Sequence, residues 1–165
     1  MRLFIAALPE GKVTKSLLAA MHDLKKAGVG GTYTANADLH MTLAFIGEVP
    51  DAKPVKEAME KLSLERFSIS LDGSGNFGNL LFASAKGNQK MKMAVKAIRA
   101  QLAQDKIPVS KESFVPHITL VRNASRVLKF PVDKAEMEVC HISLMRSDQK
   151  NGKTSYREIF RVECR

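Results

Sequence analysis

The tetrapeptide His-x-Thr-Leu occurs twice in this chain, and it constrains the fold more than any other feature. The first copy spans His40–Leu43 and the second spans His117–Leu120, and each begins a short apolar run. Short apolar runs bounded by turn residues predict β-strands. Because side chains on a strand alternate between its two faces, the histidine and the threonine of each copy share a face, about 7 Å apart. The sequence therefore predicts two strands that each present an imidazole and a hydroxyl together.

The opposite face of each predicted strand is apolar. It carries Met41, Leu43 and Phe45 in the first strand, and Ile118 and Leu120 in the second. These side chains are expected to fill a core and to anchor the strands. If the two strands face each other across a cleft, the cleft holds two imidazoles and two hydroxyls.

Such a set of groups suits chemistry at phosphorus. An in-line displacement needs a base to activate the nucleophile and an acid on the other side to protonate the leaving oxygen. Histidine titrates near pH ~6.5, so one imidazole can be neutral while the other is charged. We therefore take His40 and His117 as candidate catalytic residues, with Thr42 and Thr119 as hydrogen-bond donors to the phosphate oxygens. This chemistry requires no metal and no other cofactor.

The rest of the chain alternates between strand-like and helix-like segments, without a linker or a low-complexity region. The order favours the α+β class with a largely antiparallel sheet. Strands are predicted at 2–9, 37–49, 66–73, 80–87, 117–122, 136–145 and 154–165, helices at 10–28, 52–62 and 88–105, and turns at 72–79 and 147–155.

Composition and charge narrow the class of protein further. The chain has 165 residues, enough for one domain with a substantial core. Its net charge of +9 slightly favours polyanionic partners such as nucleic acid over the alternative, a basic protein that binds nothing in particular. Without a signal peptide or a membrane-spanning run, we expect a cytoplasmic monomer with no membrane partner. Cys140 and Cys164 are expected to be free thiols.

A third, imperfect copy of the motif begins at His141, where serine replaces threonine at Ser143. Its predicted strand is longer and continues an alternating pattern from residue 136. A structural role for His141 is therefore favoured over a catalytic one.

The segments LHMTLAFIGEV (39–49) and FVPHITLVRNA (114–124) resemble the paired motifs of the 2H phosphoesterase superfamily. Within it they look most like the RNA 2',3'-cyclic phosphodiesterases, also called 2'-5' RNA ligases. The resemblance covers nearly the whole chain. The opening strand is similar, and so is the later segment SDQKNGKTSY, whose ends Ser147 and Tyr156 would be substrate contacts.

The resemblance implies one bilobal α+β domain over 1–165. Two pseudo-symmetric lobes of mostly antiparallel sheet, with helices outside, would each contribute one motif to a central cleft. It also implies that His40 is the general acid toward the leaving 3'-oxygen and that His117 is the general base that activates water, giving a 2'-phosphate. The joining of RNA ends through a 2'-5' linkage is attributed to the same family. The residues by themselves leave the order of the two histidines open.

The family pattern has an arginine after the second motif, which matches Arg122 and implies a phosphate contact. Simple alternation disagrees, because Arg122 is five residues after His117 and would lie on the other face. The strand could end or bulge after Leu120, the side chain could reach round, or Arg122 could be a surface charge. Phe4, Phe45 and Phe114 are candidates for base stacking, although core positions are favoured for all of them.

The leading hypothesis is an enzyme, a metal-independent phosphodiesterase that acts on RNA or nucleotides with a 2',3'-cyclic phosphate. A second hypothesis changes the substrate to a small cyclic phosphate or a 2'-5' linked oligonucleotide. A third is a nucleotide- or RNA-binding module with little turnover, and the last is a purely structural protein. Binding alone does not need two titratable groups, so the paired motifs favour an enzyme.

Overall fold

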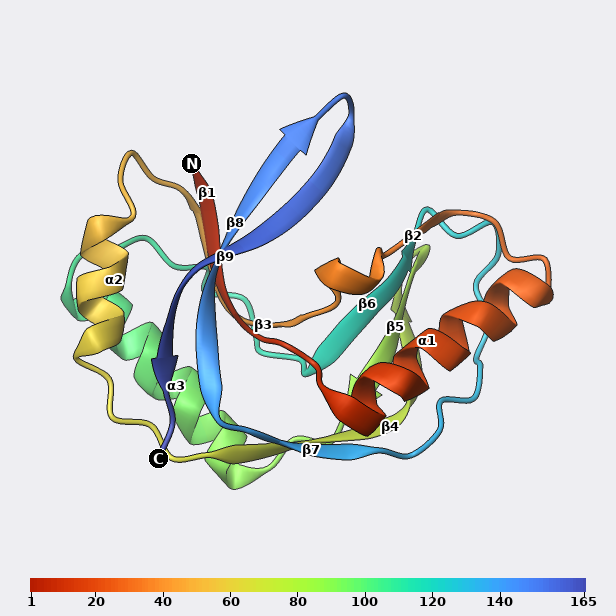
Figure 1. Ribbon diagram of the computed structural model, residues 1–165, viewed down its shortest axis with the longest axis horizontal. Helices are drawn as coiled ribbons and strands as arrows, with labels where there is room; N and C mark the ends of the chain where they lie inside the picture. The colour runs from red at the N-terminus through yellow and green to blue at the C-terminus, as the bar shows by residue number, and fades with distance from the viewer.

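Two antiparallel sheets share the strands of the chain, as the computed structural model of residues 1–165 shows (Figure 1). The α+β class predicted from the sequence is confirmed. The first sheet has the order β3-β1-β8-β9, and the second has the order β2-β6-β5-β4-β7. The strands are β1 (Arg2–Ala7), β2 (Thr32–Tyr33), β3 (Met41–Glu48), β4 (Phe67–Phe77), β5 (Leu80–Ala85), β6 (His117–Arg122), β7 (Glu136–Val139), β8 (His141–Lys150) and β9 (Lys153–Glu163).

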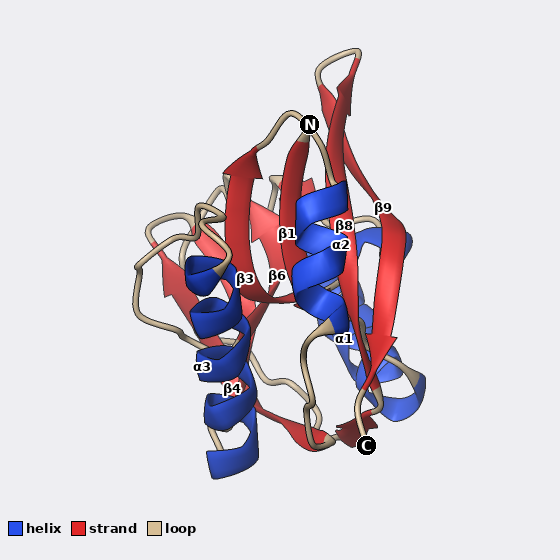
Figure 2. Cartoon of the chain, turned by 90° about the vertical axis from the view of Figure 1, so that its left-hand side faces the viewer, coloured by secondary structure: helices blue, strands red, loops and turns tan.

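Three α-helices pack against these sheets: α1 (Gly11–Lys26), α2 (Lys53–Glu60) and α3 (Gln89–Gln104). Helix α1 contacts β6 and β7 of the second sheet, whereas α2 and α3 contact each other (Figures 1 and 2). Helix α2 also contacts β9 of the first sheet, and α3 contacts β3 of the first sheet and β4 of the second. All three were predicted from the sequence. Asn88 caps α3, because its side chain accepts a hydrogen bond from the Met91 amide at 2.9 Å.

The two motif strands are anchored by buried residues. Met41 and Leu43 of β3 and Leu120 of β6 are fully buried, and Ile118 is 1% exposed. They belong to one continuous core that draws on both sheets. The prediction of an apolar anchoring face is confirmed for these four residues.

The predicted strand at 136–145 is wrong as one element. The chain leaves the second sheet after β7 and enters the first sheet at β8, with Cys140 between them. An alternating pattern continues across this junction, which is why the sequence does not reveal the change of sheet. Cys140 is half-buried and Cys164 is buried, and both are free thiols as expected.

The two predicted turns are shorter than expected. Strand β4 runs on to Phe77, because Gly73, with a φ of +76°, bends the strand at a register shift without ending it. The β8–β9 turn consists of Asn151 and Gly152, with φ values of +54° and +74°. This pair is typical of a tight hairpin turn. The short strand β2 and a 3₁₀ turn at Asn36–Asp38 were not predicted.

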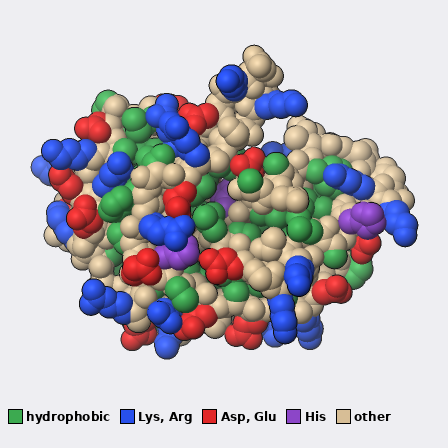
Figure 3. Space-filling model, in the orientation of Figure 1, with side chains coloured by type: hydrophobic (Ala, Val, Ile, Leu, Met, Phe, Trp, Pro, Cys, Tyr) green, Lys and Arg blue, Asp and Glu red, His purple; other side chains and the backbone are tan.

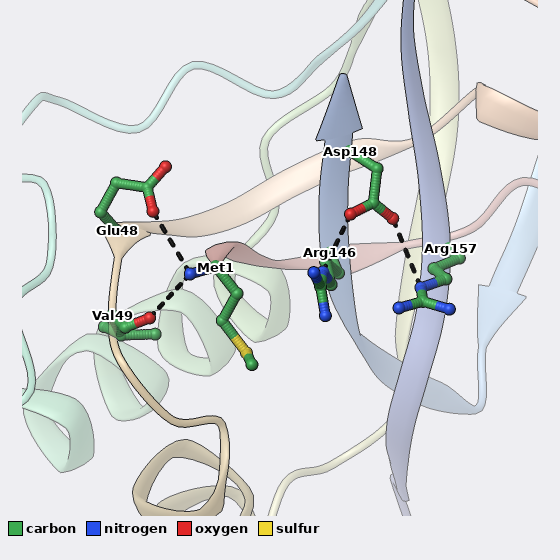
Figure 4. A network of polar contacts seen from close by, with 6 residues as sticks. All are labelled: Met1, Glu48, Val49, Arg146, Asp148 and Arg157. Atoms are coloured by element: carbon green, nitrogen blue, oxygen red, sulfur yellow. Dashed lines mark hydrogen bonds and ion pairs between the residues drawn. The ribbon is translucent and has the colours of Figure 1, made fainter. Parts of the chain in front are cut away.

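The β8–β9 hairpin extends beyond the rest of its sheet in both ribbon views (Figures 1 and 2). Near its base, the N-terminal amine of Met1 donates to the Val49 carbonyl at 2.9 Å and pairs with Glu48 at 3.3 Å (Figure 4). These contacts tie the start of β1 to the end of β3. None of the helices combines the length and the apolar composition needed to cross a membrane.

Candidate active site

The two His-x-Thr motifs occupy equivalent places at the starts of β3 and β6. His40 immediately precedes β3 and His117 is the first residue of β6. Thr42 and Thr119 follow two residues later, and all four side chains are half-buried while their neighbours face the core. Strands β3 and β6 belong to different sheets and contact each other. The motifs therefore lie where the two sheets meet.

Strand β6 contains a β-bulge directly after its motif. One step along β5, from Leu81 to Phe82, corresponds to two steps along β6, from Val121 to Thr119. The extra residue leaves Leu120 and Val121 consecutive and both buried. From this point the alternation of the strand is shifted by one residue.

Because of this bulge, Arg122 returns to the face that carries His117 and Thr119. Of the explanations open from the sequence, a bulge after Leu120 is therefore correct. The Arg122 side chain is exposed, and its charge lies near enough to His40 to affect that residue's pKa.

The same bulge occurs at the equivalent place in β3, where Leu43 and Ala44 are consecutive and both buried. Phe45 therefore lies on the face of the first motif's histidine and threonine. The expectation that it points into the core is wrong for this reason. The guanidinium carbon of Arg2 lies 4.8 Å from the centre of the Phe45 ring. Phe45 thus holds the position in β3 that Arg122 holds in β6.

Both imidazoles are oriented by a backbone carbonyl two residues earlier. The Nδ1 atom of His40 is 2.7 Å from the Asp38 oxygen, and the Nδ1 atom of His117 is 2.6 Å from the Val115 oxygen. Since a carbonyl oxygen only accepts, each Nδ1 carries a hydrogen and donates it. The neutral form of each ring then has its lone pair at Nε2, which is free for proton transfer.

Aromatic rings pack against each imidazole. The ring of His40 lies 4.8 Å from Phe4 and 5.0 Å from Tyr156, measured between ring centres. Phe4 is buried at 3% exposure and belongs to the small apolar cluster on this face, to which Phe45 also packs. Phe4 is thus a core residue, as favoured, and also forms one wall of the site.

The ring of His117 has an equivalent pair. Its centre lies 5.0 Å from Phe82 and 5.1 Å from Phe77, and the latter contact is edge-to-face. Phe77 is 48% exposed, whereas Phe82 is 6% exposed. Sequence reasoning did not select Phe77, because it falls in a Gly- and Asn-rich segment predicted to be a turn. Phe114, the third stacking candidate, packs against the core.

Gly75 permits the position of Phe82. A Cβ atom at residue 75 would lie 2.5 Å from a carbon of the Phe82 ring, closer than real Cβ atoms come to other atoms. Glycine therefore lets the ring lie over β4 and against His117. Its position in a turn-like segment concealed this role.

Asp38 connects two parts of the site on the first sheet. Its carbonyl oxygen accepts from His40, and its Oδ1 atom accepts from the backbone N–H of Tyr156 at 3.2 Å. Sequence reasoning did not select Asp38. The 3₁₀ turn that orients its carbonyl oxygen and its carboxylate was not predicted.

The pKa of His40 depends on groups from both motifs. Burial is the largest cause and lowers this pKa below its usual value of 6.5. The Asp38 carbonyl and carboxylate raise it, whereas the charges of Arg122 and His117 lower it further. Both of these cationic groups belong to β6, so they lie within electrostatic reach of the first motif.

Ser147 and Tyr156 are direct cross-strand partners in the β8–β9 hairpin and so share one of its faces. This face carries the contact between Tyr156 and His40. On the alternate positions, Asp148 accepts from Arg146 at 2.9 Å and pairs with Arg157 at 3.4 Å (Figure 4). The two arginines are therefore partly neutralised and lie on the other face of the hairpin.

His141 begins β8 and lies near the carboxylate of Glu158. Burial raises the pKa of Glu158, but hydrogen bonds from Arg161 and Ser143 and the charges of Arg161 and His141 bring it below its usual value. Ser143 is fully buried and donates to Glu158. The third copy of the motif thus builds a polar cluster on the first sheet. No group of three His, Cys, Asp or Glu side chains is arranged to hold a metal ion.

The space-filling view shows lysines and arginines spread over the outer parts of the molecule and on the projecting hairpin (Figure 3). The middle of this face is mostly uncharged and apolar, and a histidine side chain is visible there in a recess. On this face the basic side chains are spread out and do not form one dense patch.

The fold and the paired motifs define a phosphoesterase-like protein, and the comparisons with known proteins identify its class. The family described as the 2'-5' RNA ligase superfamily matches residues 14–151, and the chain belongs to it. The family resemblance read from the two motifs is therefore confirmed.

Relatives and solved structures agree with this assignment. The RNA 2',3'-cyclic phosphodiesterase of Thermotoga maritima is 29% identical over 146 residues, which are 82% of this chain and 74% of the relative. The Aeropyrum pernix protein of the same name is 26% identical, over 89% of this chain and 94% of its own. Among solved structures, Escherichia coli LigT complexed with 3'-AMP has a TM-score of 0.82 at 26% identity, over 99% of this chain and 97% of LigT. A Thermus thermophilus protein, TT0787, has a TM-score of 0.83 at 26% identity with the same coverage.

Proposed function

We propose that the protein is a metal-independent RNA 2',3'-cyclic 3'-phosphodiesterase, which opens a terminal cyclic phosphate to a 2'-phosphate. One observation carries this proposal: two imidazoles, each held by a backbone carbonyl with Nε2 free, converge from two sheets beside Arg122. The names of the relatives from Thermotoga maritima and Aeropyrum pernix support the same reaction.

In the proposed reaction, the two imidazoles act from opposite sides of the phosphorus. The Nε2 atom of His117 accepts a proton from water while the water oxygen forms a bond to phosphorus. The bond from phosphorus to the 3'-oxygen breaks, and the Nε2 atom of His40 gives that oxygen its proton. Each such proton transfer contributes typically about 10²- to 10⁴-fold.

The environment of His40 couples its protonation to substrate binding. Burial and the charge of Arg122 lower the pKa of His40, so the free protein holds this ring neutral at neutral pH. A bound phosphate adds a negative charge beside the ring and raises the pKa again. The general acid is then charged only when the group to be protonated is present.

The phosphate itself would be held by three side chains. The hydroxyls of Thr42 and Thr119 share the faces of the two imidazoles and can donate to its non-bridging oxygens. The guanidinium of Arg122 supplies a charge-assisted donor from the β6 side. Negative charge grows on these oxygens as the reaction proceeds, so the three donors act most strongly in the transition state.

Tyr156 and Ser147 are proposed contacts to the substrate beyond the phosphate. Tyr156 forms part of the wall beside His40 and lies at the base of the projecting hairpin. The ring is held from behind by Phe4 at 5.2 Å and by the backbone contact to Asp38. A half-buried ring of this kind can contact a ribose or a base.

An RNA oligonucleotide with a 2',3'-cyclic phosphate end, incubated with the protein and EDTA, tests the proposal. The expected product carries a 2'-phosphate. Activity should be lost in His40→Ala and His117→Ala and kept in His141→Ala, since His141 lies with Glu158 in the polar cluster of the first sheet. A folded wild-type protein that leaves the RNA unchanged contradicts the proposal, and so does full activity in either of the first two variants.

A further inference from the structure

A cavity of about 410 Å³ lies beside helix α3 and shares no lining residue with the two-motif site. We call it the α3 cavity. Its lining includes Lys92, Lys96 and Arg99 of the helix and Phe114 and Pro116 of the segment before β6. No acidic residue contributes to this lining. The cavity therefore combines three positive charges with an aromatic wall.

The three cations of the α3 cavity lie on one face of the helix. Lys92, Lys96 and Arg99 follow one another at spacings of four and three residues, which makes them neighbours on the helix surface. None of them belongs to an ion pair of the protein. Like charges at these spacings repel each other and destabilise a helix. A bound anion would remove this repulsion.

Arg99 is fixed in place while one of its donors has no acceptor. Its Nη1 atom donates to the Glu112 carbonyl at 2.8 Å, which ties α3 to the segment before β6. Its Nε atom is buried and has no hydrogen-bond partner in the protein. Buried polar groups are almost always hydrogen-bonded, and a guanidinium bonds most strongly to carboxylates and phosphates. The incomplete set of partners therefore also points to an anion at this cavity.

The wall of the α3 cavity leads directly into the second motif. Phe114 and Pro116 flank Val115, whose carbonyl oxygen accepts from Nδ1 of His117 at 2.6 Å. The Val115 side chain is 44% exposed. One short segment thus holds the imidazole and borders the cavity, and its middle residue lies open between them. A chain-like ligand at the histidine can continue across Val115 to the three cations.

We propose that the α3 cavity is a second anchoring site for RNA, which holds a phosphodiester of the same molecule whose cyclic end lies at the two histidines. This rests on the proposed function, because the cyclic end occupies the site described there. The inference adds a binding site away from the reacting atoms. It also makes RNA, and not a cyclic mononucleotide, the preferred substrate.

The chemistry of the lining favours RNA over a single small anion. Exposed lysines bind a polyanion through the release of its counterions, an effect that a lone phosphate ion does not provide. Lys92 and Lys96 are both exposed. The half-buried ring of Phe114 offers an apolar surface to a ribose or a base beside the phosphate.

A second basic cavity, of about 320 Å³, provides the matched control. It lies along α1, and its lining includes Lys12, Lys15 and Lys134. The carboxylate of Asp133 also lines it, no aromatic residue does, and neither motif is adjacent to it in the chain. Lys12 and Lys15 are exposed, as Lys92 and Lys96 are, so the same two charges can be removed from either cavity.

The test compares the double variant Lys92→Gln/Lys96→Gln with the double variant Lys12→Gln/Lys15→Gln and with the wild type. The kcat/KM is measured on cytidine 2',3'-cyclic phosphate and on a single-stranded RNA with the same cyclic end. The Kd of an RNA that ends in a 3'-phosphate, which cannot react, is measured by fluorescence anisotropy over a series of salt concentrations.

Lys92→Gln/Lys96→Gln is expected to leave kcat/KM on the mononucleotide unchanged and to lower it on the RNA by about 10-fold at low salt. The slope of log Kd against log salt should fall by about 1.4, because each phosphate contact to a single strand contributes about 0.7. Lys12→Gln/Lys15→Gln should behave as the wild type in all three measurements.

Three results overturn the proposal: an unchanged salt slope in Lys92→Gln/Lys96→Gln, equal losses of kcat/KM on both substrates, or the same loss in both double variants. Equal losses on both substrates would mean that the lysines act on the catalytic site itself. A wild type that hydrolyses neither substrate contradicts the proposed function. The salt slopes of RNA binding still decide in that case whether the α3 cavity holds RNA.

Discussion

The first motif, before β3, and the second, in β6, share a backbone design and differ in the side chains around it. Both have an imidazole held by a carbonyl two residues earlier, a threonine on the same face and a bulge directly after the motif. After the bulge, however, β3 presents Phe45 and β6 presents Arg122. The repeated backbone thus presents two imidazoles for proton transfer. Because the residue after the bulge is an arginine only in β6, the positive charge of the site lies on the β6 side.

The largest expected effect comes from removing one imidazole at a time. His40→Ala and His117→Ala are each expected to lower kcat/KM by about 10²- to 10⁴-fold, because each leaves one proton transfer without its group. Since the two rings act in one step, the double variant should be little worse than either single variant. Rates on the same cyclic-phosphate RNA measure all three.

If the loss of kcat/KM in the double variant equals the product of the two single losses, the histidines act independently and the expectation is contradicted. His22→Ala serves as the matched control, because His22 is an exposed helix residue outside the site.

The second test removes the positive charge that distinguishes β6 from β3. Arg122→Gln should lower kcat/KM by about 10- to 150-fold, the range expected for a lost charge-assisted hydrogen bond. It should also raise the pKa of His40, because the charge of Arg122 lowers that pKa in the wild type. A pH titration of the His40 ring by NMR measures the shift.

A fall in the pKa of His40 in Arg122→Gln would contradict the convergence of the two motifs. Arg126→Gln is a suitable control, since its guanidinium donates to the Ala27 carbonyl outside the site.

The third test alters the support of His117 alone. Gly75→Ala would bring a methyl group within 2.5 Å of the Phe82 ring, which must then move against the imidazole. A small displacement of a catalytic group can cost a large factor, and we expect a fall in kcat of about 10-fold. Gly30→Ala is the control, because its methyl group would meet Ser125 at an ordinary 3.5 Å. Equal activities in the two variants would show that Phe82 does not position His117.

The smallest expected effect concerns the support of His40. Asp38→Ala removes the acceptor for the Tyr156 amide and should reduce kcat/KM by about 2- to 12-fold, as for one hydrogen bond. Asp38→Asn keeps an oxygen acceptor but loses a negative charge that raises the pKa of His40, so this pKa should fall. An NMR titration that shows a rise in Asp38→Asn would contradict the assigned role.

The sequence was sufficient to predict the class of fold, the three helices and both motif strands. These follow from periodicity, which is a local property of the chain. The pairing of His40 with His117 was also predictable, because the same tetrapeptide was repeated at two strand starts. The family resemblance then supplied a reason to place both in one cleft.

The remaining features depend on contacts between distant segments. The bulges that turn Phe45 and Arg122 toward the site are defined by the partner strands β1 and β5, so alternation within one strand misplaces Phe45. The change of sheet at Cys140 leaves the alternating pattern intact and is invisible to it. Phe77 and Gly75 were assigned to a turn, because glycine signals flexibility in a sequence whether or not a ring packs on it.

The orientation of the two imidazoles is the most direct test of the whole proposal. Long-range ¹H–¹⁵N NMR spectra of the ring nitrogens, recorded at alkaline pH where the rings are neutral, report which nitrogen carries the hydrogen. Hydrogen bonds to the carbonyls of Asp38 and Val115 predict the Nδ1–H form for both His40 and His117, with Nε2 unprotonated. An Nε2–H form in either ring would contradict it, because Nδ1 would then have no hydrogen to donate to the backbone carbonyl.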